Sequence, residues 1–385
     1  MKKALIVANL AGFASFLISD MKLLQQMGYR IAFAANADKL AWEGTKAKLC
    51  EMGVPHHQID FDSKNPLSAQ NLRAYRQLRK LIKEEQYDLI HCHTPIAGIL
   101  TRIAARRSRA RGTKVIYTTH GLAYTAQSSF KTKLVYKTIE WVGAKLCDAI
   151  ITINREDYAA AQKLGCKKVY YIHGVGVDIQ RFADAEVDRQ AYRKSIGVED
   201  DEVMVLSVGE LSERKNHQIV IDALSRMKSG KKYVYVICGN GIDGGTGKML
   251  QEKAQRLAVR LLLLGFRRDI PQIMKCSDVG AIPSIREGLG LAGVQSLAAG
   301  VPVVGTDVQG IRDYVVDGQT GYLCSAFDAD SIAQRIEELA SLGKAERERM
   351  AMLCRKKAQE FDDAVSSRER AEIFIELLQP RKETT

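Results

Sequence analysis

Several features are scarce in this sequence of 385 residues, and each scarcity narrows the class of protein. The eight cysteines are scattered singly and include no Cys-x-x-Cys pair, so we interpret them as reduced core residues. Only seven prolines are present, and no low-complexity tract occurs. With 46% hydrophobic and 26% charged residues, the composition is that of an ordinary globular protein.

Long apolar runs are also missing. The apolar run Ala4–Ala8 near the N-terminus is too short for a signal peptide, and no apolar stretch of about 18 residues follows. We therefore expect a cytoplasmic protein that is soluble or peripheral on a membrane.

Positive charge is concentrated in two basic clusters of the first half. Residues 1–180 hold 27 Lys and Arg against 14 Asp and Glu, whereas residues 181–385 hold 30 against 31. Such clusters can meet nucleic acid, an anionic membrane or a phosphorylated acceptor, or they can form a solvated helix face. Nucleic acid is not expected as a partner, because no binding motif or interleaved aromatic pattern accompanies them. The clusters are Arg73, Arg76, Arg79, Lys80 and Lys83, and Arg102, Arg106, Arg107, Arg109 and Arg111.

The length and the alternation of elements predict two domains. One hydrophobic core usually serves no more than about 250–300 residues. Strand-like and helix-like stretches alternate in two series, which is typical of parallel sheets wound by helices. We predict an α/β fold of two doubly wound, Rossmann-like domains, with a ligand in the cleft between the carboxyl ends of their strands. The expected domains are 1–180 and 181–360, followed by 361–385 as a helix that packs back towards the first domain and a short tail.

The individual elements are predicted from the periodicity of the apolar residues. The predicted strands are 3–9, 30–35, 57–60, 89–91, 114–118, 149–153, 169–172, 203–208, 233–238, 261–264, 279–282, 301–305 and 322–324. The main predicted helices are 14–27, 39–52, 68–86, 96–108, 130–146, 155–164, 188–196 and 346–378.

The segment 283–302 is the most informative part of the chain. It is typical of a strand end, a glycine-rich turn and a short helix. Gly288 and Gly290 let the backbone approach a ligand, and the first N–H groups of the helix form an anion site suited to a diphosphate. A carboxylate beside phosphates is repelled unless it bonds hydroxyls, so Glu287 is a candidate ligand for a sugar hydroxyl. Alternatively, the glycines only make a tight turn and Glu287 is a surface residue.

This segment resembles the signature of glycosyltransferase family 4, in which a Glu, seven residues and a second Glu follow a Pro-Ser strand end. The resemblance covers nearly the whole chain, and the motifs stand in the family's order. Further motifs of the second half are similar to the donor-phosphate loop (208–217), the Gly-x-Gly turn (238–241) and the base-binding loop (264–271). Motifs of the first half, at 91–95, 117–121 and 151–158, resemble the bacterial capsule and exopolysaccharide branch.

The resemblance implies a GT-B fold with the donor site in the second domain. Lys215 is implied to be the main cation for the donor diphosphate, with Arg214 as a second one, because the Arg that many members carry is Glu210 here. The second Glu of the signature, which usually bonds the ribose, is Gln295, an amide that can still donate and accept. Glu287 is implied to be catalytic, at the sugar. The implied donor-binding residues are Gly209, Lys215, Arg267, Gly290, Leu291 and Gln295.

The first domain offers histidines at strand ends. His120 follows one such strand, where its imidazole can contact the transferred sugar or a phosphate, and a capping or core histidine is the alternative. The resemblance implies a catalytic role for His120 and acceptor binding by Gly12 and His93. His91 and His93 share one strand face, but no carboxylate motif accompanies them, so we expect a structural use near the acceptor pocket and no metal. The Asp-x-Asp sequences at 60–62 and 328–330 are interpreted as caps.

The reaction implied by the resemblance is transfer of a hexose or N-acetylhexosamine from a nucleotide-diphosphate sugar, taken to be a UDP-sugar. Retention of configuration is implied, with no metal or other cofactor. The implied acceptor is a saccharide or a polyprenyl-diphosphate-linked sugar in surface polysaccharide synthesis. Such an acceptor stays at the inner face of the membrane, where a helix over 96–111 with its arginines suits an anionic lipid surface. Two alternatives stay open: a non-catalytic sugar-nucleotide-binding subunit, and a GT-B-shaped epimerase or phosphorylase.

Overall fold

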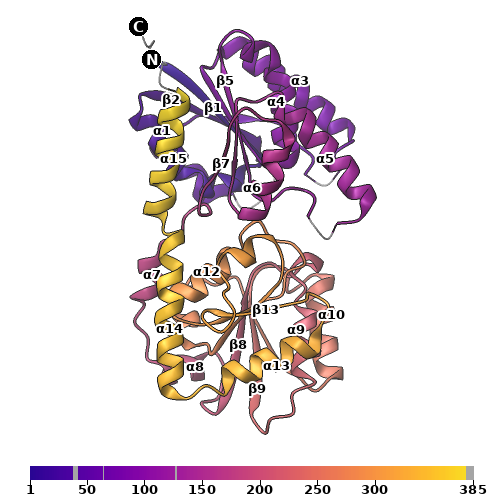
Figure 1. The fold of residues 1–385 in the computed structure, drawn as a ribbon, viewed down its shortest axis with the longest axis vertical. Helices are drawn as coiled ribbons and strands as arrows, with labels where there is room; N and C mark the ends of the chain where they lie inside the picture. Colours follow the sequence, from indigo (N-terminus) through magenta and orange to yellow (C-terminus); the bar gives the residue numbers. More distant parts are fainter. Residues whose placement is uncertain (38–41, 64, 126–127, 379–385) are drawn as a thin grey trace. The chain divides into compact units, whose positions relative to one another are not determined.

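Two parallel β-sheets, each covered by helices, make up the chain in the computed structural model, which describes residues 1–37, 42–63, 65–125 and 128–378 (Figure 1). The seven-stranded sheet has the order β3-β2-β1-β4-β5-β6-β7, and the six-stranded sheet has the order β10-β9-β8-β11-β12-β13. All described pairings between these strands are parallel. The expected α/β fold with two doubly wound domains is confirmed.

The first unit contains Met1–Val175 and the segment that begins at Ala364. Its first strand, which lies inside the sheet, includes the uninterrupted buried run Ala4–Ala8, as expected for a parallel strand with helices on both faces. Its strands are β1 (Lys2–Leu10), β2 (Tyr29–Asn36), β3 (His56–Gln58), β4 (Leu89–His93), β5 (Lys114–Thr119), β6 (Ala149–Thr152) and β7 (Val169–Tyr171). Its helices before the crossover are η1 (Ala11–Phe16, 3-10), α1 (Ile18–Gln26), α2 (Glu43–Glu51), α3 (Ala69–Glu85), α4 (Pro95–Arg109), α5 (Phe130–Ala144), α6 (Arg155–Ala161) and η3 (Gln162–Leu164, 3-10).

The second unit is Gly176–Asp363. Its strands are β8 (Glu202–Val208), β9 (Lys232–Cys238), β10 (Arg260–Gly265), β11 (Val279–Ile282), β12 (Val303–Thr306) and β13 (Gly321–Cys324). Its helices are α7 (Ile179–Ala183), α8 (Arg189–Ser195), α9 (Gln218–Leu224), α10 (Gly245–Arg256), α11 (Ile270–Cys276), α12 (Leu291–Ala298), α13 (Ala329–Ala340) and α14 (Lys344–Ala358), with 3-10 turns η4 (Glu213–Lys215), η5 (Gln309–Asp313) and η6 (Gln359–Phe361). Asp328 caps α13 by accepting a hydrogen bond from the Ser331 N–H, so the interpretation of the 328–330 sequence as a cap is confirmed.

Both sheets reverse their winding direction at one place. In the first unit the chain runs from β1 outward through β2 and β3, then returns to place β4 on the other side of β1. In the second unit the same reversal places β11 beside β8. The loops after β1 and β4 therefore diverge at one switch point, and those after β8 and β11 at the other. Ligands of doubly wound proteins bind at such points, outside the carboxyl ends of the strands.

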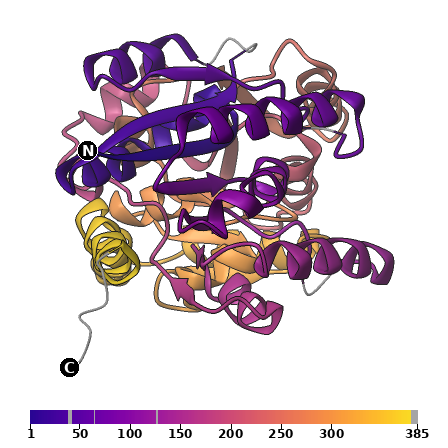
Figure 2. The ribbon, with the colours of Figure 1, turned by 90° about the horizontal axis from the view of Figure 1, so that it is seen from above.

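The predicted terminal helix 346–378 is broken in the structure. α14 and the 3-10 turn η6 end before Asp362, whose extended backbone (φ −60°, ψ 144°) interrupts the helix ahead of α15 (Asp363–Leu378). From Ala364 onward α15 belongs to the first unit, where its yellow ribbon lies beside α1 (Figures 1 and 2). The short tail expected after this helix lies outside the described residues.

The expected role of α4 as an arginine-rich helix on an anionic surface is wrong for two of its arginines. Arg102 is fully buried and pairs with Glu140 of α5 at 2.9 Å. Arg109 donates to the carboxylate of Asp148. The apolar side of α4 faces the core of the first unit, where Ala97 is fully buried. The helix uses its apolar residues to cover the sheet, so they do not form a lipid-facing side.

The interpretation of the cysteines as reduced core residues holds for the buried ones and is wrong for Cys50. All eight cysteines are unpaired by disulfides, but Cys50 is exposed. Cys147 and Cys166 lie with their sulfur atoms 3.8 Å apart as thiols. Within the described part of the chain, no helix is both long and apolar enough to cross a membrane.

Candidate functional site

The switch point of the second sheet brings a cation and a carboxylate together. Lys215 ends the 3-10 turn in the loop after β8, and Glu287 lies in the loop after β11. The Lys215 Nζ atom donates to Glu287 Oε1 at 2.5 Å, and the Arg214 guanidinium lies 3.2 Å from the same oxygen. Ser284, two residues after β11, donates its hydroxyl to that carboxylate at 2.8 Å. Residues 72 positions apart in sequence thus share one site.

The charge of Glu287 is stabilised although the side chain is only 8% exposed. Burial by itself would raise the pKa of this carboxyl group. The positive charges of Lys215 and Arg214, with the hydrogen bonds from Lys215 and Ser284, outweigh burial and hold the pKa below its usual value. At neutral pH the site therefore contains an ionised carboxylate within a small group of cations.

Glycines bring the backbone of three loops close together around this pair. A Cβ atom on Gly239, just after β9, would lie 1.7 Å from the carbonyl oxygen of Gly209. Gly290 precedes α12 with a left-handed backbone (φ 79°), and α12 begins at Leu291. The first N–H groups of α12 point out of the helix and can bind an anion. This part of the second unit has the features of a phosphate site: a helix start, a lysine and closely packed glycine backbone.

The other residues expected to bind the donor lie on the same unit and differ in the contacts they make. Arg267, after β10, forms a two-pronged pair with Asp269, which also accepts a hydrogen bond from Tyr192. Gln295 is half-buried in α12, one turn after the helix begins. Glu210 pairs with Arg214 at 3.1 Å, so Arg214 is shared between two carboxylates. Lys215 is therefore better placed than Arg214 as the main cation.

In the first unit, His93 and His120 meet at the carboxyl ends of β4 and β5. The His93 Nδ1 and His120 Nε2 atoms lie 3.1 Å apart, within hydrogen-bond distance. The ring of Phe13, next to Gly12 in the 3-10 helix η1 that follows β1, packs edge-on against His120 with 4.8 Å between centroids. The three residues expected to contact the acceptor or the sugar, Gly12, His93 and His120, therefore lie at or just after the carboxyl ends of the neighbouring strands β1, β4 and β5.

Burial keeps these histidines neutral. Burial, with a smaller effect of the Arg370 charge, lowers the pKa of His120 to about 3. Burial also lowers the pKa of His93 well below its usual value. The loop that carries His120 is fixed by Asp157 of α6, whose carboxylate accepts from the Leu122 N–H at 3.0 Å. A neutral imidazole on a fixed loop can donate to, or accept from, a hydroxyl.

Known protein families match both units. The model of "Glycosyl transferases group 1" matches residues 188–357, and that of "Glycosyltransferase Family 4" matches residues 19–181. The putative glycosyltransferase EpsD of Bacillus subtilis is 34% identical over 368 residues, which cover 94% of this chain and 93% of EpsD. The chain is a glycosyltransferase of family 4.

Two further comparisons bear on this glycosyltransferase. A UDP-Gal:alpha-D-GlcNAc-diphosphoundecaprenol alpha-1,3-galactosyltransferase of Escherichia coli is 32% identical over 271 residues, 68% of each chain. Among solved structures, Anabaena HepE in complex with UDP and glucose has a TM-score of 0.78 at 22% identity, covering 98% of this chain and 100% of HepE. This likeness shows the GT-B fold.

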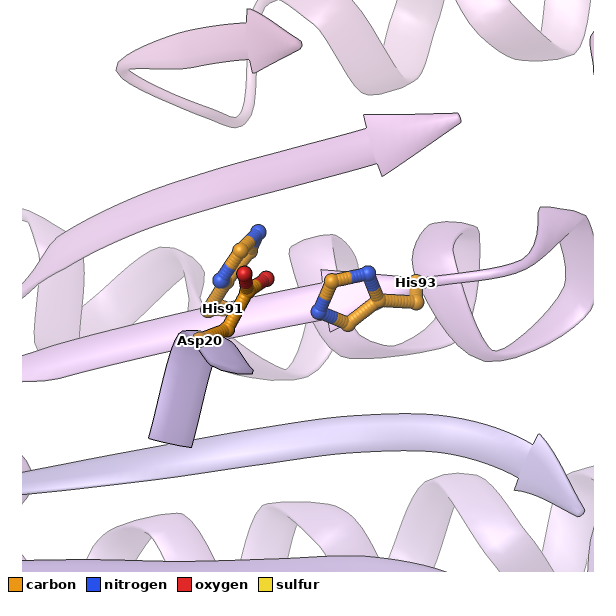
Figure 3. Close-up of side chains that lie close together, drawn as sticks. All are labelled: Asp20, His91 and His93. Carbon is orange, nitrogen blue, oxygen red and sulfur yellow. The ribbon is translucent and has the colours of Figure 1, made fainter. Parts of the chain in front are cut away.

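The glycosyltransferase also contains a buried cluster of polar side chains that includes His93. Asp20, His91 and His93 offer ligand atoms within 4.8 Å of one another (Figure 3), so the fold brings a carboxylate to the two histidines although no carboxylate motif accompanies them in the sequence. Asp20 comes from α1, which the sequence could not place beside β4. Arg370 Nε lies 2.6 Å from Asp20 Oδ1 and already compensates the carboxylate. A metal cation would be repelled by Arg370, so these residues fit a buried ion pair beside neutral imidazoles better than a metal site.

Sequence reasoning missed the residues that fix the backbone around His93 in the glycosyltransferase. Thr94 has a positive φ of 64°, which is strained for a β-branched residue. Its hydroxyl accepts from the Asn9 N–H at 3.2 Å, and the Asn9 side chain accepts from the Ala97 N–H at 2.6 Å. These bonds tie the end of β1 to the start of α4 around His93. A polar Asn at a strand end was the only signal available in the sequence.

Proposed function

We propose that this glycosyltransferase moves a hexose or N-acetylhexosamine from a UDP-sugar to a lipid-linked or saccharide acceptor in surface polysaccharide synthesis. The observation that carries the proposal is the pair Lys215 and Glu287 at the start of α12. HepE was solved with UDP and glucose, and the E. coli relative is named for UDP-Gal and a diphosphoundecaprenol-linked GlcNAc. These names support a UDP-sugar and a lipid-linked acceptor for this chain as well.

The second unit is proposed to hold the donor. Lys215 and the first N–H groups of α12, from Leu291, bind the diphosphate, while Glu287 exchanges its bond from Lys215 for a sugar hydroxyl. Gly209 and Gly290 allow the backbone to approach the diphosphate closely. Gln295 bonds the ribose, and Arg267 lies next to the base of the nucleotide. The charge of the leaving diphosphate is thereby stabilised by groups that are already in place.

The first unit is proposed to bind the acceptor through Gly12 and His93, with His120 at the transferred sugar. We propose transfer with retention: the bond from the anomeric carbon to the diphosphate breaks as the acceptor oxygen attacks from the same face. The departing diphosphate takes the acceptor proton. The protein contributes by positioning the reactants and by stabilising the leaving charge. We propose that no metal takes part and that the reaction occurs at the inner, anionic face of the cell membrane.

A transfer assay tests this function. The purified chain is incubated with labelled UDP- and GDP-sugars and a polyprenyl-diphosphate-linked sugar, with and without EDTA. We expect product from a UDP-sugar, with the same anomeric configuration as the donor, and full activity in EDTA. An inverted product would contradict the proposed stereochemistry, and activity that needs added manganese would contradict metal independence.

The role of Lys215 is tested by nucleotide binding. Lys215→Met removes the charge and keeps most of the side-chain length. A charge-assisted hydrogen bond contributes about 1.5–3 kcal/mol, so the Kd for UDP should rise roughly 10–100-fold, while the Kd for UMP changes little. Isothermal titration measures both. Equal weakening of the two nucleotides would remove Lys215 from the diphosphate site.

A non-catalytic sugar-nucleotide-binding subunit is the second candidate, favoured by one observation. Glu210 stands where many members of the family carry an Arg, and it neutralises part of the charge of Arg214 by pairing with it at 3.1 Å. Such a subunit would bind UDP-sugars and show neither transfer nor donor hydrolysis in the same assay.

A further inference from the structure

Helix α5 of the first unit exposes a large apolar surface. Its buried residues are Glu140, Gly143 and Ala144, all near its C-terminal end. Five large apolar side chains are exposed, ranging from 79% for the first of them to 41% for the last: Phe130, Leu134, Val135, Trp141 and Val142. Contiguous apolar surface of this kind marks an interaction site far more often than scattered single residues do.

These five side chains share one side of the helix. At about 100° per residue, Phe130, Trp141 and Leu134 fall within an arc of about 40°, and Val142 and Val135 extend it to about 140°. The opposite side is fixed to the unit, because Arg102 of α4 pairs with Glu140 and stacks over Tyr117 with 4.0 Å to the ring centroid. Along its length α5 therefore carries an apolar side that the described residues of its own unit leave exposed.

The exposed charges on α5 itself are all positive. Lys131, Lys137 and Lys145 are exposed, and Lys145 Nζ lies 3.3 Å from the ring centroid of Trp141. The single acidic residue of α5 is Glu140, which is buried and paired. Long lysine side chains can lie along apolar surface while their ammonium groups stay with anionic groups in water.

A groove extends the apolar surface towards α6. It has a volume of about 670 Å³, and its apolar lining includes Leu134 and Trp141 of α5 and Ala160 of α6. Its charged lining consists of the acidic residues Glu156 and Asp157 and the lysines Lys133, Lys137 and Lys163. All of these residues belong to the first unit. Such a groove can hold a hydrocarbon chain beside the helix, which a flat protein surface cannot do.

We propose that α5 is the membrane-binding element of this glycosyltransferase: it lies in the surface of an anionic bilayer with Phe130, Leu134 and Trp141 among the lipid chains. A helix side that carries large apolar residues together with lysines, on a helix without an exposed acidic residue, matches a helix at a lipid interface. The proposal rests on the proposed function only in that a lipid-linked acceptor requires the enzyme to reach a membrane. It replaces α4, whose apolar side is buried, as the lipid-facing element.

Vesicle flotation with charge-matched variants tests the proposal. Vesicles of phosphatidylcholine alone are compared with vesicles of equal parts phosphatidylcholine and phosphatidylglycerol. Leu134→Gln combined with Trp141→Gln leaves the net charge unchanged, and Leu72→Gln changes an exposed leucine of α3 as the control. We expect binding to the anionic vesicles only, lost with added salt, at least tenfold weaker in the α5 variant and unchanged in the control.

The two tryptophans give a second readout. Trp42 is nearly buried, whereas Trp141 is exposed, so a blue shift of emission on adding anionic vesicles reports Trp141 entering lipid. UDP titration is run in parallel, and the α5 variant should retain the wild-type Kd for UDP. Loss of vesicle binding with intact UDP binding separates this proposal from the donor site. Equal flotation of wild type and variant, binding to neutral vesicles alone, no binding at all, or a dimer that only the α5 variant abolishes would overturn it.

Discussion

At the scale of single residues, the carboxylate of Glu287 has an unusual combination of properties. It is almost buried, yet its pKa is lowered, because Lys215 and Arg214 surround it. An ionised carboxylate in this position can accept a hydrogen bond from a sugar hydroxyl. Its removal would leave Lys215 without its partner and more available to a diphosphate.

Glu287→Gln should therefore separate donor binding from transfer. The amide keeps the shape and can still accept from Ser284, but it lacks the charge that holds the sugar. We expect the transfer rate to fall about 10²–10³-fold, while the Kd for UDP stays the same or decreases. Steady-state kinetics and isothermal titration measure the two quantities. A Kd for UDP that rises as much as the rate falls would assign Glu287 to the nucleotide.

From the sequence, the positions of Lys215 and Glu287 at strand ends were easier to predict than the contact between them. Lys215 and Glu287 follow predicted strands, so their place at the strand ends could be deduced. Their direct pairing depends on the order of β8 and β11 in the sheet, which a single sequence does not contain. The same limit applies to Asp20 and Arg370, which are far apart in sequence and form an ion pair in the first unit.

The buried histidines make stability depend on pH. In the folded chain the pKa of His91 and of His120 is lowered to about 3, mainly by burial, and that of His217 to about 4. An unfolded histidine has a pKa of about 6.5, so below that pH the unfolded chain binds protons that the folded chain does not. The free energy of unfolding is therefore highest above about pH 6.5 and falls as the pH is lowered towards 4.

His91→Gln tests this pH dependence in the first unit. Each such histidine should contribute about 1.4 kcal/mol per pH unit between about pH 6.5 and 4. Urea unfolding followed by tryptophan fluorescence reports the first unit, since Trp42 and Trp141 both belong to it. The variant should lose about that amount of slope. An unchanged slope would mean that His91 titrates normally in the folded chain.

At the scale of elements, α4 and α5 are joined by a buried ion pair. The sequence predicted both helices, but it suggested a solvated surface for Arg102. Gly143 of α5 explains the difference, because a Cβ there would lie 2.5 Å from the Arg102 guanidinium carbon. The glycine leaves room for the arginine to reach Glu140. Charge patterning along one helix could not reveal a partner on the next.

Glu140→Ala should destabilise the first unit by about 3–5 kcal/mol, because it leaves the Arg102 charge buried without a partner. The double variant Arg102→Met with Glu140→Leu removes both charges and should recover most of this loss. Urea unfolding followed by tryptophan fluorescence measures both variants. A double variant as unstable as Glu140→Ala would show that the cost arises from lost packing.

At the scale of the whole molecule, the chain leaves its first unit after Val175 and returns to it at Ala364. The sequence suggested a final helix that packs back on the first domain, with boundaries at 180 and 360. The break itself was not predictable, since the helical pattern of 346–378 continues through Asp362. In the structure His173 pairs with Glu369 at 2.6 Å, and Phe374 packs edge-on against His91 in the first unit.

Two buried phenylalanines lie on either side of Ala364 in the sequence, and replacing each of them should destabilise a different unit. Phe374 is fully buried in the first unit, and Phe361 is 1% exposed in the second, edge-on against Tyr314. Replacing a core phenylalanine by alanine costs about 3–5 kcal/mol. Because each side chain packs within its own unit, Phe374→Ala should speed hydrogen exchange in β1 and β4, and Phe361→Ala in β8 and β11. Peptide-level hydrogen exchange with mass spectrometry measures both. If the two variants raised exchange in the same strands, the chain would unfold as one cooperative unit and the assignment of α15 to the first unit would have no energetic meaning.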